Sequence, residues 1–303
     1  MEYSTECMAA LRQAAPAIEI KQDEPMSCHT TFAIGGPADL FLMPATVDEL
    51  TAALRVLRAY ETPFLLVGNG SNMLVSDAGV RGAVICTAAL DAVSAQEDTL
   101  TVEAGALLSR VARWAQHEGL TGMEFAGGIP GSMGGAVFMN AGAYDGQMEG
   151  IVEKTAYLDE QGVLHTVEGA AHGFGYRQSI FRDHPDWTII RSTLRLRPGD
   201  PAAIAEKMND FAQRRRDKQP LNFPSAGSTF KRPAGHFAGR LIEDAGLKGA
   251  SVGAAQVSEK HAGFLINRGG ATCEDMLRLI ALVQRRVREQ FGVELECEVR
   301  IIR

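Results

Sequence analysis

Glycine is concentrated in two stretches that could bind an anionic group through the main chain. The first, Gly68-Asn69-Gly70-Ser71-Asn72, follows the apolar run 64–67, which is typical of a buried strand. Glycines at such a place let neighbouring N–H groups converge on an anion, as in a phosphate-binding nest. Met73 occupies the third glycine position of the dinucleotide-binding fingerprint, and no P-loop motif is present. Taken alone, this loop is about as consistent with a plain strand-to-strand turn.

The second stretch, residues 127–144, contains six glycines and one proline. Its corner Pro130-Gly131-Ser132 precedes a predicted short helix, whose first N–H groups could meet a phosphate. Two glycine-rich loops can hold a pyrophosphate between them, which favours a large cofactor. The alternative is structural, because a short helix that packs closely on a sheet also requires small residues.

Composition excludes several classes of function. The chain has 303 residues, is 46% hydrophobic and carries a formal charge of −7, so it is a folded globular protein without the basic surface of a nucleic-acid-binding protein. Five scattered cysteines with no CxxC pair predict neither disulfides nor zinc, and the histidines show no metal-binding spacing, so we expect no metal. No apolar run is long enough to cross a membrane and the first residues are acidic, which predicts a cytoplasmic protein without a membrane partner.

Helix and strand patterns alternate along most of the chain. The sequence predicts an N-terminal arm with a short helix (1–28), a helix capped by Thr46 and Glu49, a hairpin around residues 159–162 and a helix opened by Thr272 and Asp275. Residues 198–201 read as the clearest linker. The last segment, 293–301, alternates strictly between apolar and polar residues and predicts one continuous strand with Glu294, Glu296 and Glu298 on one face.

The order of several short motifs resembles the UDP-N-acetylenolpyruvoylglucosamine reductase family of bacterial cell-wall precursor synthesis. The resemblance runs from about residue 30 to the end of the sequence and rests on both glycine stretches, on Tyr176-Arg177-Gln178-Ser179-Ile180-Phe181, on Gly227-Ser228-Thr229-Phe230-Lys231 and on Glu298-Val299-Arg300. The compact length and the 227–233 sequence look like the shorter form of the family, which lacks an additional tyrosine-bearing substrate loop.

This resemblance implies an α+β fold with an FAD-binding domain of the vanillyl-alcohol-oxidase type in two subdomains (29–88 and 89–198) and a C-terminal α+β substrate domain (199–303). FAD would be bound non-covalently. The implied cofactor-binding residues are Gly68, Asn69, Gly70, Ser71, Asn72, Gly127, Gly128, Ile129, Pro130, Gly131, Ser132, Gly134, Gly135, Asn140, Ala141 and Gly142.

The implied reaction is the reduction of UDP-N-acetylglucosamine enolpyruvate to UDP-N-acetylmuramate, with NADPH as reductant and hydride passing from FAD to the vinyl carbon. By resemblance, Ser228 protonates the resulting enolate-like anion and Arg177 stabilises its charge, for which a planar guanidinium suits a carboxylate. Glu298 assists, and if it donates a hydrogen bond it must be protonated, which requires partial burial. The pattern alone does not choose it over Glu294 or Glu296.

By resemblance, the predicted substrate-binding residues are Lys218, Tyr176, Lys231 and His261, although the match over residues 256–261 does not settle which of its members contacts the substrate. His261 is equally consistent with a structural role. The partner is therefore a UDP-sugar, and we expect a monomer, although the sequence does not fix the oligomeric state. Two alternatives stay open: an FAD-dependent oxidase or dehydrogenase of another small substrate on the same fold, and a flavin-binding sensor without turnover.

Overall fold

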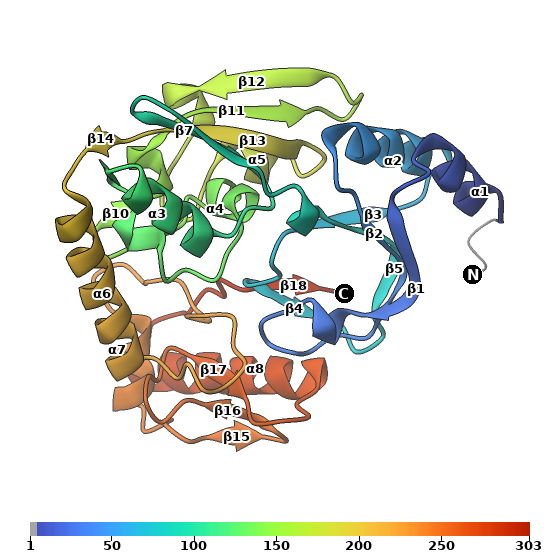
Figure 1. Cartoon of the computed structure of the whole chain (residues 1–303). Coiled ribbons are helices and arrows are strands. Elements are labelled where there is room, and N and C mark those ends of the chain that lie inside the picture. The colour runs from blue at the N-terminus through green and yellow to red at the C-terminus, as the bar shows by residue number, and fades with distance from the viewer. Residues whose placement is uncertain (1–4) are drawn as a thin grey trace. The chain divides into compact units, whose positions relative to one another are not determined.

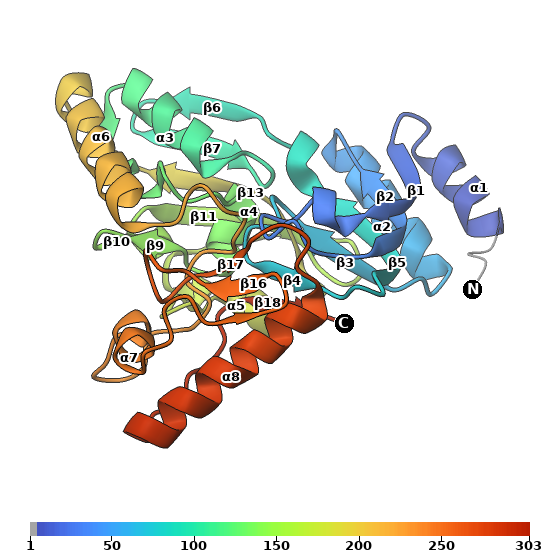
Figure 2. The same ribbon diagram turned by 90° about the horizontal axis from the view of Figure 1, so that it is seen from below.

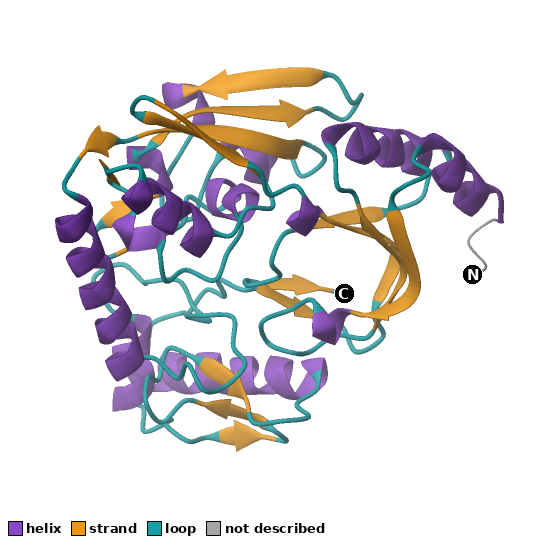
Figure 3. Ribbon diagram, in the orientation of Figure 1, coloured by secondary structure: helices purple, strands orange, loops and turns teal. Residues whose placement is uncertain are grey.

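The computed structural model describes residues 5–303, which form two compact units (Figure 1). Unit 1 contains the residues up to Gln22, Leu40–Asn69 and Gly82–Gln213, and unit 2 contains Asp23–Asp39, Gly70–Arg81 and Arg214–Arg303. Helices and strands occur in both units (Figure 3). Each unit therefore collects segments that are far apart in the sequence.

The described residues form several α-helices, two of which begin at the caps predicted from the sequence, Thr46 and Thr272. They are α1 (Thr5–Ala14), α2 (Val47–Ala59), α3 (Leu108–His117), α4 (Met133–Phe138), α5 (Ile180–Asp183), α6 (Pro201–Lys218), α7 (Ala238–Asp244) and α8 (Cys273–Phe291). The strands are β1 (Glu19–Pro25), β2 (Pro37–Met43), β3 (Phe64–Val67), β4 (Met73–Val75), β5 (Val80–Cys86), β6 (Val93–Gln96), β7 (Thr99–Glu103), β8 (Leu120–Thr121), β9 (Gly142–Ala143), β10 (Gly146–Gln147), β11 (Val152–Leu158), β12 (Leu164–Glu168), β13 (Thr188–Arg195), β14 (Arg197–Pro198), β15 (Ser251–Val252), β16 (Ala255–Val257), β17 (Leu265–Asn267) and β18 (Arg300–Ile302).

A five-stranded antiparallel sheet in the order β12-β11-β13-β7-β6 forms the centre of unit 1. Helices α3 and α4 bury their apolar side chains against it, so that Val102 of β7, Val111 of α3 and Val137 of α4 share one core. The short helix α4 contains the second glycine stretch. Packing on the sheet therefore fixes the position of that stretch.

The N-terminal segment is more ordered than the sequence predicted. Residues 1–4 lie outside the described part of the chain, but α1 packs on α2 and buries Cys7 and Leu11. Strand β1 is the edge strand of a sheet with the order β1-β2-β5-β3, in which β3 and β5 are parallel. The predicted short helix is present as α1, but over residues 5–28 the prediction of a loosely specified arm was wrong, because these residues complete a core and a sheet formed by later segments of the sequence.

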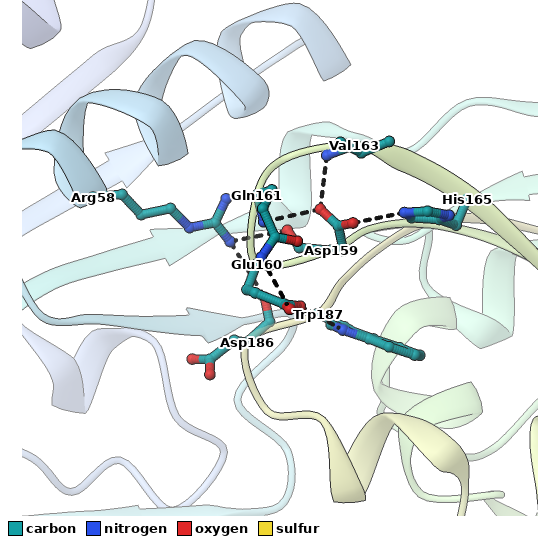
Figure 4. Close-up of polar contacts among 8 residues, drawn as sticks. All are labelled: Arg58, Asp159, Glu160, Gln161, Val163, His165, Asp186 and Trp187. Atoms are coloured by element: carbon teal, nitrogen blue, oxygen red, sulfur yellow. Dashed lines mark hydrogen bonds and ion pairs between the residues drawn. The ribbon is translucent and has the colours of Figure 1, made fainter.

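The predicted hairpin around residues 159–162 is confirmed as the β11–β12 turn (Figure 4). The Asp159 carboxylate accepts hydrogen bonds from the N–H groups of Gln161 (2.9 Å) and Val163 (2.8 Å) and lies 2.6 Å from His165 Nε2. Arg58 of α2 donates to the carbonyl oxygen of Asp159 at 3.2 Å. This turn is closed by its own side chain and held against α2.

Unit 2 is built around α8, which lies alongside the three-stranded sheet β15-β16-β17 (Figure 2). Its core joins Phe32, Ile34 and Leu74 to apolar residues of α7 and α8. The predicted capping box is present, because Thr272 Oγ1 accepts from the Asp275 N–H at 3.0 Å and the Asp275 carboxylate accepts from the Thr272 N–H at 3.2 Å. The N-terminal cap of this long helix could thus be read directly from the sequence.

Two predicted elements differ from the structure. In α2, Thr46 caps the Glu49 N–H at 3.1 Å as expected, but the Glu49 carboxylate reaches back to the N–H of Ala45 at 2.7 Å rather than to the cap residue. The predicted continuous strand 293–301 is also wrong. Only Arg300–Ile302 form strand β18, which pairs in parallel with β4, while Cys297 forms an isolated bridge with Phe230.

Candidate active site

Within unit 1, the first two residues of the Gly68–Asn72 loop lie against the second glycine stretch. A Cβ atom at Gly68 would lie 2.0 Å from Ser132 Oγ, so only glycine permits this approach. Asn69 Nδ2 donates a hydrogen bond to the Pro130 carbonyl at 2.6 Å. The fold therefore brings together two glycine-rich segments that are about 60 residues apart in the sequence.

The start of α4 has both internal and unused N–H groups. Met133 and Gly134 donate to the carbonyl oxygens of Ala106 and Ala104, each at 2.8 Å, so these two N–H groups do not point to a ligand. Among residues 5–303, the N–H groups of Gly131, Ser132 and Gly135 have no hydrogen-bond acceptor. Such orphan donors at a helix start, with Ser132 only 2% exposed, suit an anion such as a pyrophosphate.

Close packing explains several of the glycines. A Cβ at Gly134 would lie 3.0 Å from Ala104 Cβ, one at Gly142 would lie 2.7 Å from the Gly146 carbonyl oxygen, and one at Gly146 would lie 2.5 Å from the Phe125 ring. At Gly135 the only neighbour among the described residues is Ser132 Oγ, at an ordinary 3.5 Å. The structural alternative thus accounts for Gly134 and Gly142, whereas Gly135 leaves room for a ligand to approach the backbone.

Asn140 organises the end of the glycine stretch. Its side chain is 1% exposed, donates to the Gly175 carbonyl at 2.9 Å and accepts from the Glu149 N–H at 2.9 Å. Tyr144 follows in the β9–β10 turn, where its ring stacks on Phe211 of α6 at 4.3 Å. The Asn140 amide is therefore engaged with protein groups, which is a structural role that the sequence pattern did not reveal.

Sequence reasoning missed Glu124, which lies just before the glycine stretch and is 3% exposed. It accepts hydrogen bonds from the Thr121 hydroxyl and from the Gly122 N–H at 3.0 Å, and Lys207 Nζ of α6 lies 3.6 Å away. Burial opposes its ionisation, but these hydrogen bonds and Lys207 outweigh burial and lower the pKa of Glu124. The spacing Thr121-x-x-Glu124 is the signal that could have found it, since it matches a capping box.

Arg177 lies in a tight turn of unit 1 in which Gly175 and Gln178 exchange main-chain hydrogen bonds of 3.1 and 3.2 Å. Its φ of +56° is uncommon for a residue with a side chain, and such conformations cluster at functional sites. The guanidinium lies 5.0 Å from the centre of the Tyr176 ring, and Tyr176 is 55% exposed. Asn140 holds this turn through the Gly175 carbonyl.

Ser228 and Glu298 are brought together in unit 2. The Glu298 N–H donates to the Thr229 carbonyl at 2.8 Å, and the Lys231 N–H donates to the Glu296 carbonyl at 2.8 Å. Ser228 itself bridges to Phe264 on the other side. Two predicted catalytic residues therefore lie on paired segments, although 70 positions separate them in the sequence. Glu298 pairs with Thr229, and Ser228 is the residue just before Thr229.

The structure distinguishes the three carboxylates that the sequence pattern left equivalent. The side chain of Glu294 is 75% exposed and lies 3.4 Å from Arg288, and that of Glu296 is 70% exposed and pairs with Lys231. Glu298 is half-buried. Partial burial, the property expected of a carboxyl group that acts as a hydrogen-bond donor, therefore belongs to Glu298.

The predicted substrate residues in unit 2 lie in different surroundings. Lys218 is exposed at the last position of α6, and Lys231 is half-buried beside Glu296. His261 Nδ1 accepts from the Gly263 N–H at 3.1 Å, and its ring meets Phe264 edge to face at 4.9 Å. Burial, and secondarily the charges of Lys248 and Lys218, lower the pKa of His261. These contacts keep its ring neutral and fixed.

The described residues offer neither a metal site nor a membrane-spanning helix. In the part of the chain that the structure describes, no group of three or more His, Cys, Asp or Glu side chains is arranged to hold a metal ion. None of the described helices is both long and apolar enough to cross a membrane.

Comparisons with known proteins agree with this geometry. Residues 219–302 match the family model of the UDP-N-acetylenolpyruvoylglucosamine reductase C-terminal domain, and residues 38–179 match an FAD binding domain. The UDP-N-acetylenolpyruvoylglucosamine reductase of Caldanaerobacter subterraneus subsp. tengcongensis is 49% identical over 280 residues, which is 92% of each chain. That of Clostridium perfringens is 48% identical over 284 residues, covering 94% of this chain and 93% of the relative.

Solved structures also resemble this chain, and the match is stronger for a UDP-N-acetylenolpyruvylglucosamine reductase than for a glucose dehydrogenase. The crystal structure of UDP-N-acetylenolpyruvylglucosamine reductase from Thermus caldophilus has a TM-score of 0.80 and 35% identity, covering 94% of this chain and 100% of that chain. The glucose dehydrogenase Phl p 4.0202 has a TM-score of 0.50 at 15% identity, over 65% of this chain and 44% of that one, a likeness that shows the fold alone.

These matches confirm the α+β fold with an FAD-binding domain of the vanillyl-alcohol-oxidase type, the FAD cofactor and the class of oxidoreductase. The backbone donors at Gly131, Ser132 and Gly135 fit such a cofactor. Since relatives with nearly half of their residues identical align over more than nine tenths of the sequence, the chain belongs to the UDP-N-acetylenolpyruvoylglucosamine reductase family.

Proposed function

We propose that this protein reduces UDP-N-acetylglucosamine enolpyruvate to UDP-N-acetylmuramate, a step of peptidoglycan precursor synthesis, with NADPH as reductant. The observation that carries the proposal is the register that brings Ser228 next to the half-buried Glu298 in unit 2. Neither the glycine stretches nor the FAD-binding domain would require the main-chain segments that carry these two residues to pair. A flavin-binding sensor or an oxidase of another substrate would therefore leave this juxtaposition unexplained.

The chemistry that bound FAD would supply is hydride transfer between NADPH and the vinyl carbon of the enolpyruvyl ether. The N–H groups of Gly131, Ser132 and Gly135 would hold the pyrophosphate, since they are oriented donors at a helix start. Gly68 and Asn69 keep this segment in place through Ser132 and Pro130. The remaining glycines of the two stretches would line the cofactor or support its lining.

Ser228 would donate the proton that completes the reduction. Hydride addition leaves an enolate-like anion on the substrate, which is basic enough to take a proton from a hydroxyl group that is a poor acid toward water. The side chain of Ser228 is exposed, while the next residue, Thr229, is fully buried and bonded through its N–H to the Gly263 carbonyl at 2.9 Å. The hydroxyl is thus attached to a fixed backbone and would be accessible to a substrate.

Arg177 and Glu298 would stabilise the charge that develops beside the substrate carboxylate. A guanidinium can bind a carboxylate through two parallel hydrogen bonds, and preorganised charges of this kind supply a large part of catalysis. Arg177 belongs to unit 1 and the other two residues belong to unit 2. Their convergence over the flavin ring stays a prediction of this proposal.

The UDP moiety would be held by cationic and aromatic side chains. Lys218 and Lys231 offer positive charge to a diphosphate, Tyr176 offers an exposed ring, and His261 contributes a fixed neutral ring. We further propose that the FAD-binding domain covers residues 29–198 and that residues 199–303 form the substrate domain of a monomeric protein. The family matches to 38–179 and 219–302 support these boundaries.

The proposal is tested by separating the two half-reactions in a stopped-flow spectrometer. In Ser228→Ala, reduction of bound FAD by NADPH should stay within about twofold of the parent, while reoxidation by the enolpyruvyl substrate should slow by about 10²-fold to about 10⁴-fold, the range for loss of a general acid. Ser251→Ala, which alters an exposed serine of β15 in the same unit, is the matched control and should behave as the parent in both steps.

Two outcomes would contradict this function. If the enolpyruvyl substrate fails to reoxidise the reduced parent protein, the substrate assignment is wrong. If Ser228→Ala slows both half-reactions equally, Ser228 is not the proton donor.

A further inference from the structure

The loop Gly68–Asn72 contains two asparagines whose side chains bind different parts of the chain. Asn69 Nδ2 donates to the Pro130 carbonyl at 2.6 Å, within the cofactor segment of unit 1. Asn72 Nδ2 donates to the carbonyl oxygen of Glu298 at 3.2 Å, within unit 2. Both asparagines were expected to contact FAD. Their actual hydrogen-bond acceptors indicate two separate tasks.

Glu298 occupies the point where the chain changes its strand partner. Up to Cys297 the backbone pairs with the segment around Phe230, and from Arg300 onward it pairs with β4. At Glu298 the N–H is bonded to the Thr229 carbonyl on one side, and the C=O accepts from Asn72 on the other. Its Cα atom is thus held between two segments, one of which carries Ser228.

We propose that Asn72 is a positioning residue for Glu298, an inference that rests on the proposed function. The Asn72 side-chain amide fixes the main chain at Glu298, where the chain changes its strand partner. It thereby sets where the Glu298 carboxyl group lies relative to the Ser228 hydroxyl and the substrate. The amide is suited to this task because its NH2 group is a hydrogen-bond donor, whereas the Glu298 carbonyl oxygen can only accept. The Asn72 residue is half-buried, which shields the bond from water.

The main chain of Asn72 makes the inference testable without loss of the fold. Its carbonyl oxygen accepts from the Arg300 N–H at 3.1 Å, and this bond and the following β4–β18 ladder do not depend on the side chain. Replacing the Asn72 side chain should therefore leave β18 in place and remove only the hydrogen bond to the Glu298 carbonyl oxygen. A shift of about 1 Å in a catalytic group reduces the rate by about 10²-fold.

The test uses the FAD-loaded full-length protein, NADPH and the enolpyruvyl substrate, followed by flavin absorbance in a stopped-flow spectrometer. In Asn72→Ala and in the isosteric Asn72→Asp, reoxidation at saturating substrate should slow by about 10-fold to about 100-fold, with flavin reduction and the apparent substrate Kd within about twofold of the parent. Asn69→Ala should instead weaken FAD retention. The exposed Asn209→Ala of α6 should change neither step.

A double-mutant cycle distinguishes positioning from a general structural effect. If Asn72 acts through Glu298, Asn72→Ala should slow reoxidation by less than about threefold when Glu298 is already glutamine, because coupled residues are not additive. Equal slowing in both backgrounds would overturn the inference, as would an Asn72→Ala protein whose reoxidation matches the parent. If Glu298→Gln alone has no effect on reoxidation, the proposed role of Glu298 fails instead, and the two failures are thereby distinguished.

Discussion

Replacing Gly68 by alanine tests whether the close approach of the two glycine segments builds the cofactor site. The new methyl carbon would lie 2.0 Å from Ser132 Oγ and 3.0 Å from Ser132 Cβ, whereas nonbonded carbon contacts prefer about 3.5–4.0 Å. Ser132 is 2% exposed and has little room to move. Rotation of the Ser132 hydroxyl would still leave its Cβ at 3.0 Å, so the loop and the start of α4 must separate by at least about 0.5 Å, and overpacking of this kind destabilises by about 1–3 kcal/mol.

Each kcal/mol lowers the melting temperature of a domain of 150–250 residues by about 2–4 °C, so Gly68→Ala should melt about 2–12 °C below the parent. FAD retention should fall as well, because the N–H donors at Ser132 and Gly135 move away from Asn69. Differential scanning fluorimetry measures the first effect. Flavin content after gel filtration measures the second.

A second substitution at Ser132 should restore the melting temperature and the flavin content of Gly68→Ala, to a degree that depends on how many Ser132 atoms it removes. Ser132→Ala removes the atom at 2.0 Å but leaves Cβ at 3.0 Å, so the rescue should be partial, and Ser132→Gly removes both atoms and should rescue further. Gly135→Ala is the control for packing alone: its methyl group would meet only an ordinary 3.5 Å contact, so the thermal stability of the flavin-free protein should not fall. If Gly68→Ala melts with the parent and keeps its flavin, or if neither change at Ser132 improves it, the reasoning is refuted.

Three further changes test buried polar groups of unit 1. Burial lowers the pKa of His172 below its ordinary 6.5, so the unfolded chain binds the proton more readily and the protein loses stability as the pH falls below 6.5. In His172→Gln, the melting temperature measured between about pH 8 and about pH 5 should lack this loss. Burial opposes ionisation of Glu124, but hydrogen bonds from Thr121 and Gly122 lower its pKa below 4.5 overall, so the stability that it contributes is present above pH 4.5 and is lost below it. Glu124→Gln should therefore be less stable than the parent at pH 7. If the difference in stability between the two proteins does not narrow towards about pH 3, this prediction is contradicted. Asn140→Ala removes two hydrogen bonds of a buried amide, to the Gly175 carbonyl and from the Glu149 N–H, so it should lower the unfolding free energy in urea by about 1–3 kcal/mol; an unchanged midpoint would show that water replaces the amide.

Short sequence patterns were sufficient to predict an element when the residues that stabilise it lie a few positions apart in the sequence. The box of Thr272 and Asp275 and the turn closed by Asp159 were predicted from spacings of a few residues, and both are present. Strand β1 and the shortened β18 were not predicted, because their pairing depends on segments far away in the chain.

The same limit applies to the candidate site. The motif order suggested that the two glycine stretches act together, and the contacts of Gly68 and Asn69 in unit 1 agree with it. Alternation along residues 293–301 could not choose Glu298, because its burial depends on pairing with the Ser228 segment. The hydrogen bond of Asn72 to Glu298 is likewise invisible to any local pattern, since 226 positions separate the two residues.

That separation has a consequence for how the protein is made. The short pieces 23–39 and 70–81 belong to unit 2, yet β18, the strand partner of β4 in the second piece, is synthesised last among the described elements. At about 5–20 residues per second, the ribosome needs roughly 10–45 s to span the interval, during which β4 has no native neighbour at its edge. Unit 2 must therefore assemble after translation of residues 300–302, and an aggregation-prone apolar strand is exposed to chaperones for as long as the ribosome takes to reach them.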